Sequence, residues 1–129
     1  MTPELTALAL AAFLQLGQIG LAAWSMYRDG LARWNASPRD EEVEFSILTG
    51  RLRRAVSNHF EALAFFTIAV VVVTLTDSQS GFTAACALFY LAARALYIPA
   101  YAFGWVPGRS ILYSIGAVAS FAMILAALL

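Results

Sequence analysis

The sequence predicts an all-α integral membrane protein, a four-helix bundle in which a single transmembrane domain covers residues 1–129. Hydrophobic residues make up 61% of the chain and charged residues 12%, whereas soluble domains have about a quarter of their residues charged. Four apolar runs are each long enough to cross about 30 Å of hydrocarbon. We expect helices over about 5–28, 51–76, 81–103 and 109–129. Short loops separate the last three runs, which makes neighbouring helices antiparallel.

The first apolar run is predicted to remain in the protein as a helix. A secretory signal peptide begins with positive charge, but the first charged residue here is Glu4. Gln15 and Gln18 share one face, and we expect their amides to point toward other helices, where such groups find hydrogen-bond partners. Gly17 and Gly20 are predicted to allow a neighbouring helix to approach closely.

The second apolar run carries three polar residues on one helical face. Arg54, Asn58 and Glu61 are four and then three residues apart, a spacing that places them on one side of an α-helix. A carboxylate this far inside an apolar segment is unfavourable, and an ionisable residue within a membrane is a functional candidate. The same pattern is also typical of a structural ion pair that fixes helix packing. The helix alone leaves both interpretations open.

The third and fourth runs repeat this arrangement. Arg94, Tyr97 and Tyr101 are three and then four residues apart and share one face of the third helix,. Tyr113 lies one turn beyond Arg109 on the same face of the fourth helix. An interfacial anchor is the simpler interpretation of Tyr101 and Tyr113 taken alone. Tyr97 lies deeper in its run, which favours a site.

The charge pattern predicts the topology and excludes other classes of protein. The chain has no lysine, and six of its eight arginines lie between Arg28 and Arg54 beside an acidic segment, so no basic face remains for nucleic acid. If the arginine-rich loop is cytoplasmic, both termini face outward. The single cysteine, Cys86, lies in an apolar run with no metal-ligand spacing around it, which indicates a buried, inert thiol and no metal site.

Depth along the helices predicts an ion pair and a pocket. Glu61 and Arg94 are each ten residues from the cytoplasmic end of their helices, about 15 Å deep at 1.5 Å per residue. Opposite charges at equal depth on adjacent helices are expected to pair, within a subunit or across an interface between subunits. Between this pair and the cytoplasm we expect a polar pocket for a small, anionic, peptide-like ligand. Its predicted lining is Arg54, Asn58, Tyr97, Tyr101, Arg109 and Tyr113.

These residues resemble the two motifs of the MAPEG family, membrane-associated proteins in eicosanoid and glutathione metabolism. Arg54-Ala55, Asn58 and Glu61 match the family's second-helix pattern, Arg-Ala-x-x-Asn-x-x-Glu. Its third-to-fourth-helix pattern is matched by Arg94, Tyr97, Tyr101, Arg109 and Tyr113. The resemblance covers the whole chain, including the long first loop. It implies a four-helix bundle that assembles as a homotrimer, with glutathione bound between subunits near the cytoplasmic side.

The resemblance also implies residue roles. Arg54, Asn58 and Glu61 would hold glutathione through its carboxylates and backbone. Tyr97 and Tyr101 would contact it from the third helix. Arg94, Arg109 and Tyr113 complete the implied set of binding residues. Of these, Arg109 and Tyr97 are the catalytic candidates, because Arg109 matches the arginine thought to stabilise the thiolate in leukotriene C synthase-like members.

Two departures narrow the resemblance. Prostaglandin E synthase-like members have Arg where this chain has Ser57, and His where it has Tyr97. The chain is therefore more similar to the leukotriene C synthase and microsomal glutathione transferase branches. Its short length also resembles bacterial members, which implies a multi-pass protein of a bacterial inner membrane.

Two functions follow as hypotheses. The first is a glutathione-dependent transferase or peroxidase acting on lipophilic electrophiles dissolved in the bilayer, with glutathione as co-substrate. The second is a non-catalytic membrane protein that uses the same pocket to bind a small thiol, a lipid headgroup or a protein partner. A stoichiometric thiolate signal with glutathione at neutral pH separates the first from the second.

Overall fold

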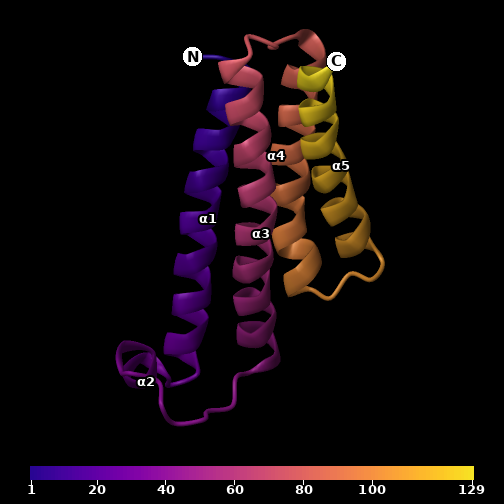
Figure 1. Ribbon diagram of the computed structural model, residues 1–129. Coiled ribbons are helices and arrows are strands. Elements are labelled where there is room, and N and C mark those ends of the chain that lie inside the picture. The colour runs from indigo at the N-terminus through magenta and orange to yellow at the C-terminus, as the bar shows by residue number, and fades with distance from the viewer.

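The computed structural model describes all residues from Met1 to Leu129, and four of its helices are long and apolar enough to span a membrane. They are α1 (Pro3–Arg28), α3 (Ile47–Leu75), α4 (Gly81–Ala102) and α5 (Gly108–Leu128). They run side by side as a bundle, with both termini at the same end (Figure 1). The predicted all-α transmembrane bundle is confirmed.

Three of the four long helices, α1, α3 and α4, begin at residues that satisfy free backbone N–H groups. Thr2 and Ser46 accept from the backbone of Leu5 and Thr49, at 3.3 Å in both cases. Ser80 begins α4 with a reciprocal capping box, in which Ser80 and Thr83 exchange side-chain to backbone hydrogen bonds,. Because the Ser46 cap lies before the charged turn of α3, this helix begins four residues earlier than the sequence predicted, at 47 rather than 51.

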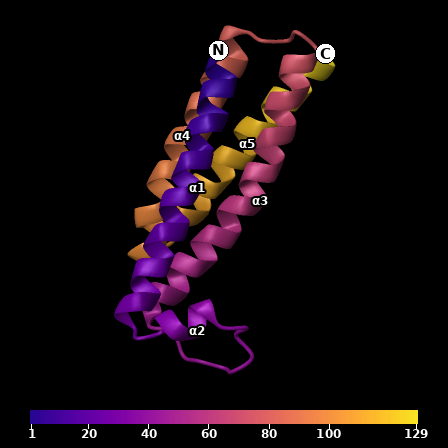
Figure 2. The same cartoon turned by 90° about the vertical axis from the view of Figure 1, so that its left-hand side faces the viewer.

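A short helix in the first loop was not predicted. It is α2 (Ala32–Ala36), which lies at the lower ends of α1 and α3 in both ribbon views (Figures 1 and 2). It is too short to show helical periodicity in the sequence. Tertiary contacts hold this segment, since the rings of Trp34 and Phe45 pack edge to face with centroids 5.5 Å apart.

Helices α3 and α4 form the centre of the bundle, because α1 and α5 each contact both of them and do not contact each other. The core is built from small residues around one aromatic pair. Phe66 of α3 stacks on Tyr90 of α4 with ring centroids 3.8 Å apart. A Cβ on Gly116 of α5 would lie 3.4 Å from the Tyr90 ring, so this glycine lets α5 approach closely.

Buried polar side chains join α1 to the rest of the bundle. Gln15 and Gln18 are buried and bond to α3, as their shared face predicted. Glu4 is also buried and accepts a hydrogen bond from the hydroxyl of Thr83 on α4. The prediction for Gly17 and Gly20 was wrong within this chain, since nothing lies within 4 Å of a Cβ placed on either.

Candidate functional site

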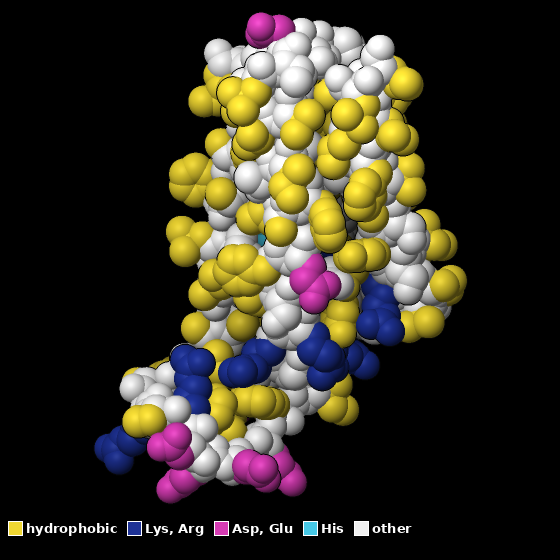
Figure 3. Space-filling model, viewed as in Figure 1, with side chains coloured by type: hydrophobic (Ala, Val, Ile, Leu, Met, Phe, Trp, Pro, Cys, Tyr) yellow, Lys and Arg dark blue, Asp and Glu magenta, His cyan; other side chains and the backbone are white.

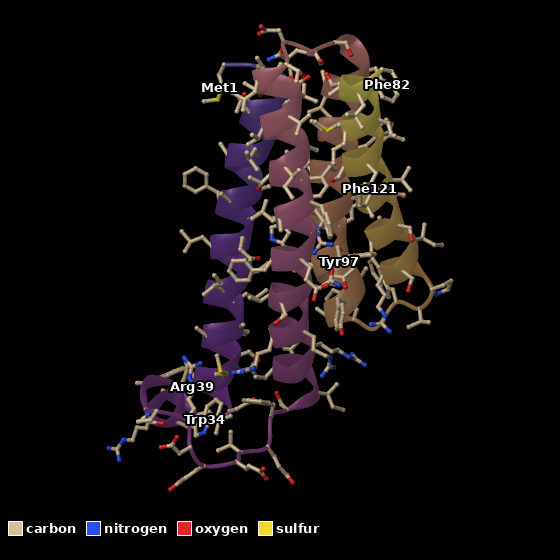
Figure 4. The ribbon with its side chains drawn as sticks, in the orientation of Figure 1. Met1, Trp34, Arg39, Phe82, Tyr97 and Phe121 are labelled. Carbon is tan, nitrogen blue, oxygen red and sulfur yellow. The ribbon has the colours of Figure 1, made fainter.

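A cavity of about 330 Å³ opens between α3, α4 and α5, and we call it the polar pocket. Figure 4 shows the labelled Tyr97 at its level, beside α3 in the lower half of the bundle. The lining residues come from three helices and are almost all polar or aromatic: Arg54, Asn58, Tyr97, Tyr101, Arg109, Ser110, Tyr113 and Ser114. All six residues that the sequence predicted as its lining are among them.

The guanidinium groups of Arg54 and Arg109 both lie against the Tyr101 ring. The Arg54 Nε donates to the Tyr101 hydroxyl at 3.0 Å. The Arg109 guanidinium carbon lies 5.0 Å from the centroid of the same ring, within the range of a cation–π contact. Tyr101 therefore contacts both arginines of the polar pocket.

Arg94 supports the pocket from behind. Its side chain is 1% exposed, and its Nη1 donates to Asn58 Oδ1 at 3.2 Å. Its guanidinium carbon lies 4.2 Å from the centre of the Tyr97 ring. Arg94 does not line the polar pocket, so it touches two lining side chains and acts through them.

The predicted ion pair between Glu61 and Arg94 does not form within the chain. Arg94 bonds to Asn58 instead, and its Nε and Nη2 have no hydrogen-bond partner. Glu61 is exposed and does not line the polar pocket. The physical reason is rotation about the helix axis: Glu61 is two residues beyond the fully buried His59, about 200° further around α3. Equal depth therefore did not bring the two charges together.

His59 is a buried polar residue of α3 that the predicted pocket lining does not include. It is 0% exposed, and its Nδ1 lies 2.6 Å from Gln15 Oε1 and 2.9 Å from Gln18 Nε2. It belongs to the buried face of α3 together with Ala55 and Ala62. The spacing of four and three in these residues is the signal that predicts its burial.

A second cavity of about 730 Å³ adjoins the polar pocket, and we call it the apolar groove. It lies between α4 and α5, and most of its lining is hydrophobic. Ser110 and Ser114 of α5 line both cavities, although neither serine was predicted as a site residue. Cys86 lines the groove, is 8% exposed and is not part of the polar pocket.

The chemistry of the polar pocket is that of an anion site. Its lining provides two arginines, an amide and three phenols, with no carboxylate. Guanidinium groups bind carboxylates in two-point contacts, and phenols donate hydrogen bonds. In Figure 3 the arginine side chains form a band across the lower bundle, while acidic side chains gather on the loop below it. No group of three or more His, Cys, Asp or Glu side chains could hold a metal ion.

Comparison with known families gives one match. The sequence model of the MAPEG family matches residues 5–129, which is nearly the whole chain and includes every residue of the polar pocket. Comparison with curated proteins and with solved structures gives no match.

Proposed function

Because the chain belongs to the MAPEG family, we propose that it is a membrane-bound, glutathione-dependent transferase or peroxidase acting on lipophilic electrophiles. The observation that carries this proposal is the junction at Ser110 and Ser114, where the polar pocket meets the apolar groove. A charged, water-soluble thiol and an apolar electrophile need adjacent sites of this kind. The proposed branch is the microsomal glutathione transferase and leukotriene C synthase-like one.

Binding is assigned to the side chains that carry charge or an amide. Arg54 faces the carboxylates of glutathione, Arg109 faces its sulfur, and Asn58 bonds to its peptide backbone. Tyr101 and Tyr113 add phenol donors. This division is supported by the absence of any carboxylate in the single-chain lining, because no acidic side chain there competes with the ligand for the two guanidinium groups.

Catalysis is assigned to Arg109 and Tyr97. The glutathione thiol loses its proton to solvent water, and the sulfur lone pair then forms a bond to the electrophilic carbon while the bond to the leaving group breaks with its electron pair. A nearby positive charge favours the thiolate over the thiol. Tyr97 is 3% exposed, lines the pocket and makes no hydrogen bond to another side chain. Its phenol is therefore free to donate to the sulfur.

We further propose a homotrimer in a bacterial inner membrane, with glutathione between subunits. Glu61 supports this assembly, because its exposed carboxylate lies one turn beyond Asn58 on α3, outside the single-chain pocket but close to it. In the trimer Glu61 would complete the glutathione site. Native mass spectrometry in mild detergent is expected to show three chains, and a purely monomeric spectrum would contradict the assembly.

The test of function follows the thiolate itself. Purified protein is titrated with glutathione at neutral pH while the ultraviolet absorbance of the thiolate is recorded. We expect one thiolate per site in the natural protein and loss of this signal in Arg109→Ala. Arg109→Lys keeps a point charge without the planar fork, so part of the signal is expected to return. Each pKa unit by which the thiol is shifted corresponds to about 1.4 kcal/mol.

The matched control is Arg33→Ala, because Arg33 is exposed on α2 and outside the polar pocket. It is expected to leave the thiolate signal unchanged. Arg54→Ala is expected to weaken glutathione binding and raise its apparent KM. If glutathione binds but no thiolate forms in any variant, the pocket belongs to a non-catalytic binding protein and the enzymatic proposal is wrong.

A further inference from the structure

A third cavity, of about 420 Å³, lies between α1 and α3 near α2, and we call it the α1–α3 cavity. One part of its lining is apolar and the other is polar. The apolar residues are Ile19, Ala22, Ala23, Met26 and Val56. The polar residues are Asn35, Arg39, Arg53, Arg54 and Ser57. The proposed glutathione chemistry uses only Arg54 of this set.

The polar part of the cavity is positively charged and lacks acidic partners. Its lining includes three arginines and no carboxylate. Arg39 Nε donates to the Asn35 carbonyl oxygen at 3.1 Å, and Arg53 Nη1 donates to Met26 Sδ at 3.3 Å. Neither contact neutralises charge, and most guanidinium N–H groups of both residues remain available. Paired guanidinium groups of this kind match the oxygens of a phosphate.

Aromatic rings hold these arginines in place over the cavity. The Arg53 guanidinium carbon is 4.4 Å from the Phe45 ring centroid and 5.7 Å from that of Trp34. Arg39 lies 5.9 Å from the Trp34 ring. Figure 4 shows the labelled Trp34 and Arg39 together at the α2 segment. Tryptophan is enriched where a membrane meets water, which is where a phospholipid headgroup lies.

The depth of the cavity matches a phospholipid that stands in the bilayer. Val56 is 19 residues from the far end of α3 at Leu75, about 28 Å at 1.5 Å per residue. The hydrocarbon core is about 30 Å thick. The apolar part of the lining therefore lies at the edge of the hydrocarbon. Arg53 lies nearly one turn closer than Val56 to the N-terminus of α3, at the level of the headgroups.

We propose that the α1–α3 cavity binds an anionic phospholipid. The phosphate lies between Arg39 and Arg53, and an acyl chain lies along the apolar side chains of α1 and α3. A soluble phosphate would use only the charged part of the lining, whereas a lipid uses both parts. The α1–α3 cavity shares only Arg54 with the polar pocket, and the phosphate contacts of Arg39 and Arg53 do not depend on glutathione chemistry.

The experiment measures lipid binding by native mass spectrometry of the purified protein in detergent. The protein is titrated with dioleoyl phosphatidylglycerol, which is anionic, and in a separate series with dioleoyl phosphatidylcholine, which has no net charge and the same acyl chains. The affinities of the two lipids are then compared. We expect tighter binding of phosphatidylglycerol. Arg39→Gln and Arg53→Gln are each expected to weaken it by about fivefold, since one arginine near a lipid surface contributes about 1 kcal/mol. Arg33→Gln removes an exposed arginine outside the cavity and is expected to have no effect.

A second variant tests the apolar part without changing charge. Ala23→Phe places a ring in the cavity and is expected to weaken phosphatidylglycerol binding while all three arginines remain. This variant also keeps the proposal testable if Arg39→Gln or Arg53→Gln fails to fold. Equal affinity for the two lipids would overturn the proposal, as would an equal loss of binding in Arg33→Gln. Glycerol 3-phosphate that binds as tightly as the lipid would show that the acyl chain plays no part, and would also overturn it.

Discussion

Arg94 is a buried cation whose hydrogen-bonding partner is an amide. It donates to Asn58 Oδ1, and two of its nitrogens have no partner. A charged group in this position is sensitive to the loss of its remaining hydrogen bond, because hydrogen bonds to charged groups contribute about 1.5–3 kcal/mol. The position of Asn58 in the polar pocket therefore depends on a residue that does not line the pocket.

This contact predicts different effects for two neighbouring residues of α3. Asn58→Ala is expected to lower the free energy of unfolding by about 1–3 kcal/mol, because it leaves the Arg94 guanidinium without its partner. Glu61→Gln is expected to change it by less than about 0.5 kcal/mol, because Glu61 is exposed,. Denaturant unfolding in detergent without glutathione measures both. A loss of several kcal/mol in Glu61→Gln would contradict this and indicate an ion pair formed between subunits.

Asp29 joins the end of α1 to the start of α3 outside the membrane-spanning segments. Its Oδ2 accepts from the Thr49 hydroxyl at 2.6 Å and from the Ser46 hydroxyl and backbone N–H at 2.9 and 3.2 Å. The Thr49 hydrogen bond makes the largest contribution in holding the Asp29 pKa below its usual value, and those of Ser46 add to it. The charged form of Asp29 is thus favoured in the folded protein.

The sign of this shift predicts how stability depends on pH. A carboxyl group whose folded pKa is depressed stabilises the protein above its unfolded pKa, which is about 3.9 for aspartate. That contribution is lost as the pH falls through the lower, folded pKa. Asp29→Asn is therefore expected to melt below the natural protein at pH 7, with a difference that shrinks in strong acid. Asp40→Asn, at an exposed residue, is the control. A difference that does not change with pH would contradict the assignment.

At the scale of the helices, a side-chain hydrogen bond joins the N-terminal ends of α1 and α4. Glu4 is 1% exposed and accepts from the Thr83 hydroxyl through Oε1, while Oε2 has no partner. The Thr83 hydroxyl also accepts a hydrogen bond from the backbone N–H of Ser80 at 2.9 Å, so it belongs to the cap of α4. One hydroxyl therefore serves a helix end and a contact between helices.

Removal of this hydroxyl is expected to weaken the contact between α1 and α4. Thr83→Val keeps the shape of the side chain but leaves Glu4 buried without a donor, which is expected to lower the free energy of unfolding by about 1–3 kcal/mol. Thr83→Ser keeps the hydroxyl and is expected to retain most of the stability. Unfolding curves of the two variants in the same detergent make the comparison. Equal losses would assign the effect to packing of the methyl group.

The sequence predicted the helices better than their rotation. Apolar length and turn residues determine where a transmembrane helix runs, so the four spans were found, whereas α2 rests on the contact between Trp34 and Phe45. The lining of the polar pocket was found because its residues repeat at helical spacing. The pair of Glu61 and Arg94 does not form within the chain, because depth alone does not determine which way a side chain faces. The predicted close approach of a helix to Gly17 is absent within the chain for the same reason.

For the whole molecule, the distribution of charge predicts its orientation in the membrane. All eight arginines lie in one half of the bundle, and loops rich in arginine stay in the cytoplasm. The other end exposes Asp77 in the turn between α3 and α4, while Glu4 at that end is buried. Both termini share the end with Asp77 (Figure 1). They are therefore predicted to face outward, with the long first loop inside.

Cysteine labelling in intact cells tests this orientation. Cys86 is buried and is first replaced by serine, so that a single introduced cysteine reports its own position. Asp77→Cys is expected to react with a membrane-impermeant maleimide in intact cells, because the turn after α3 faces outward. Asp40→Cys lies in the loop at the arginine-rich end and is expected to react only after the cells are opened. If Asp40→Cys reacts in intact cells and Asp77→Cys requires lysis, the predicted orientation is wrong. The polar pocket would then open on the side of the membrane opposite the cytoplasm. The proposed reaction, which needs cytoplasmic glutathione, would be contradicted as well.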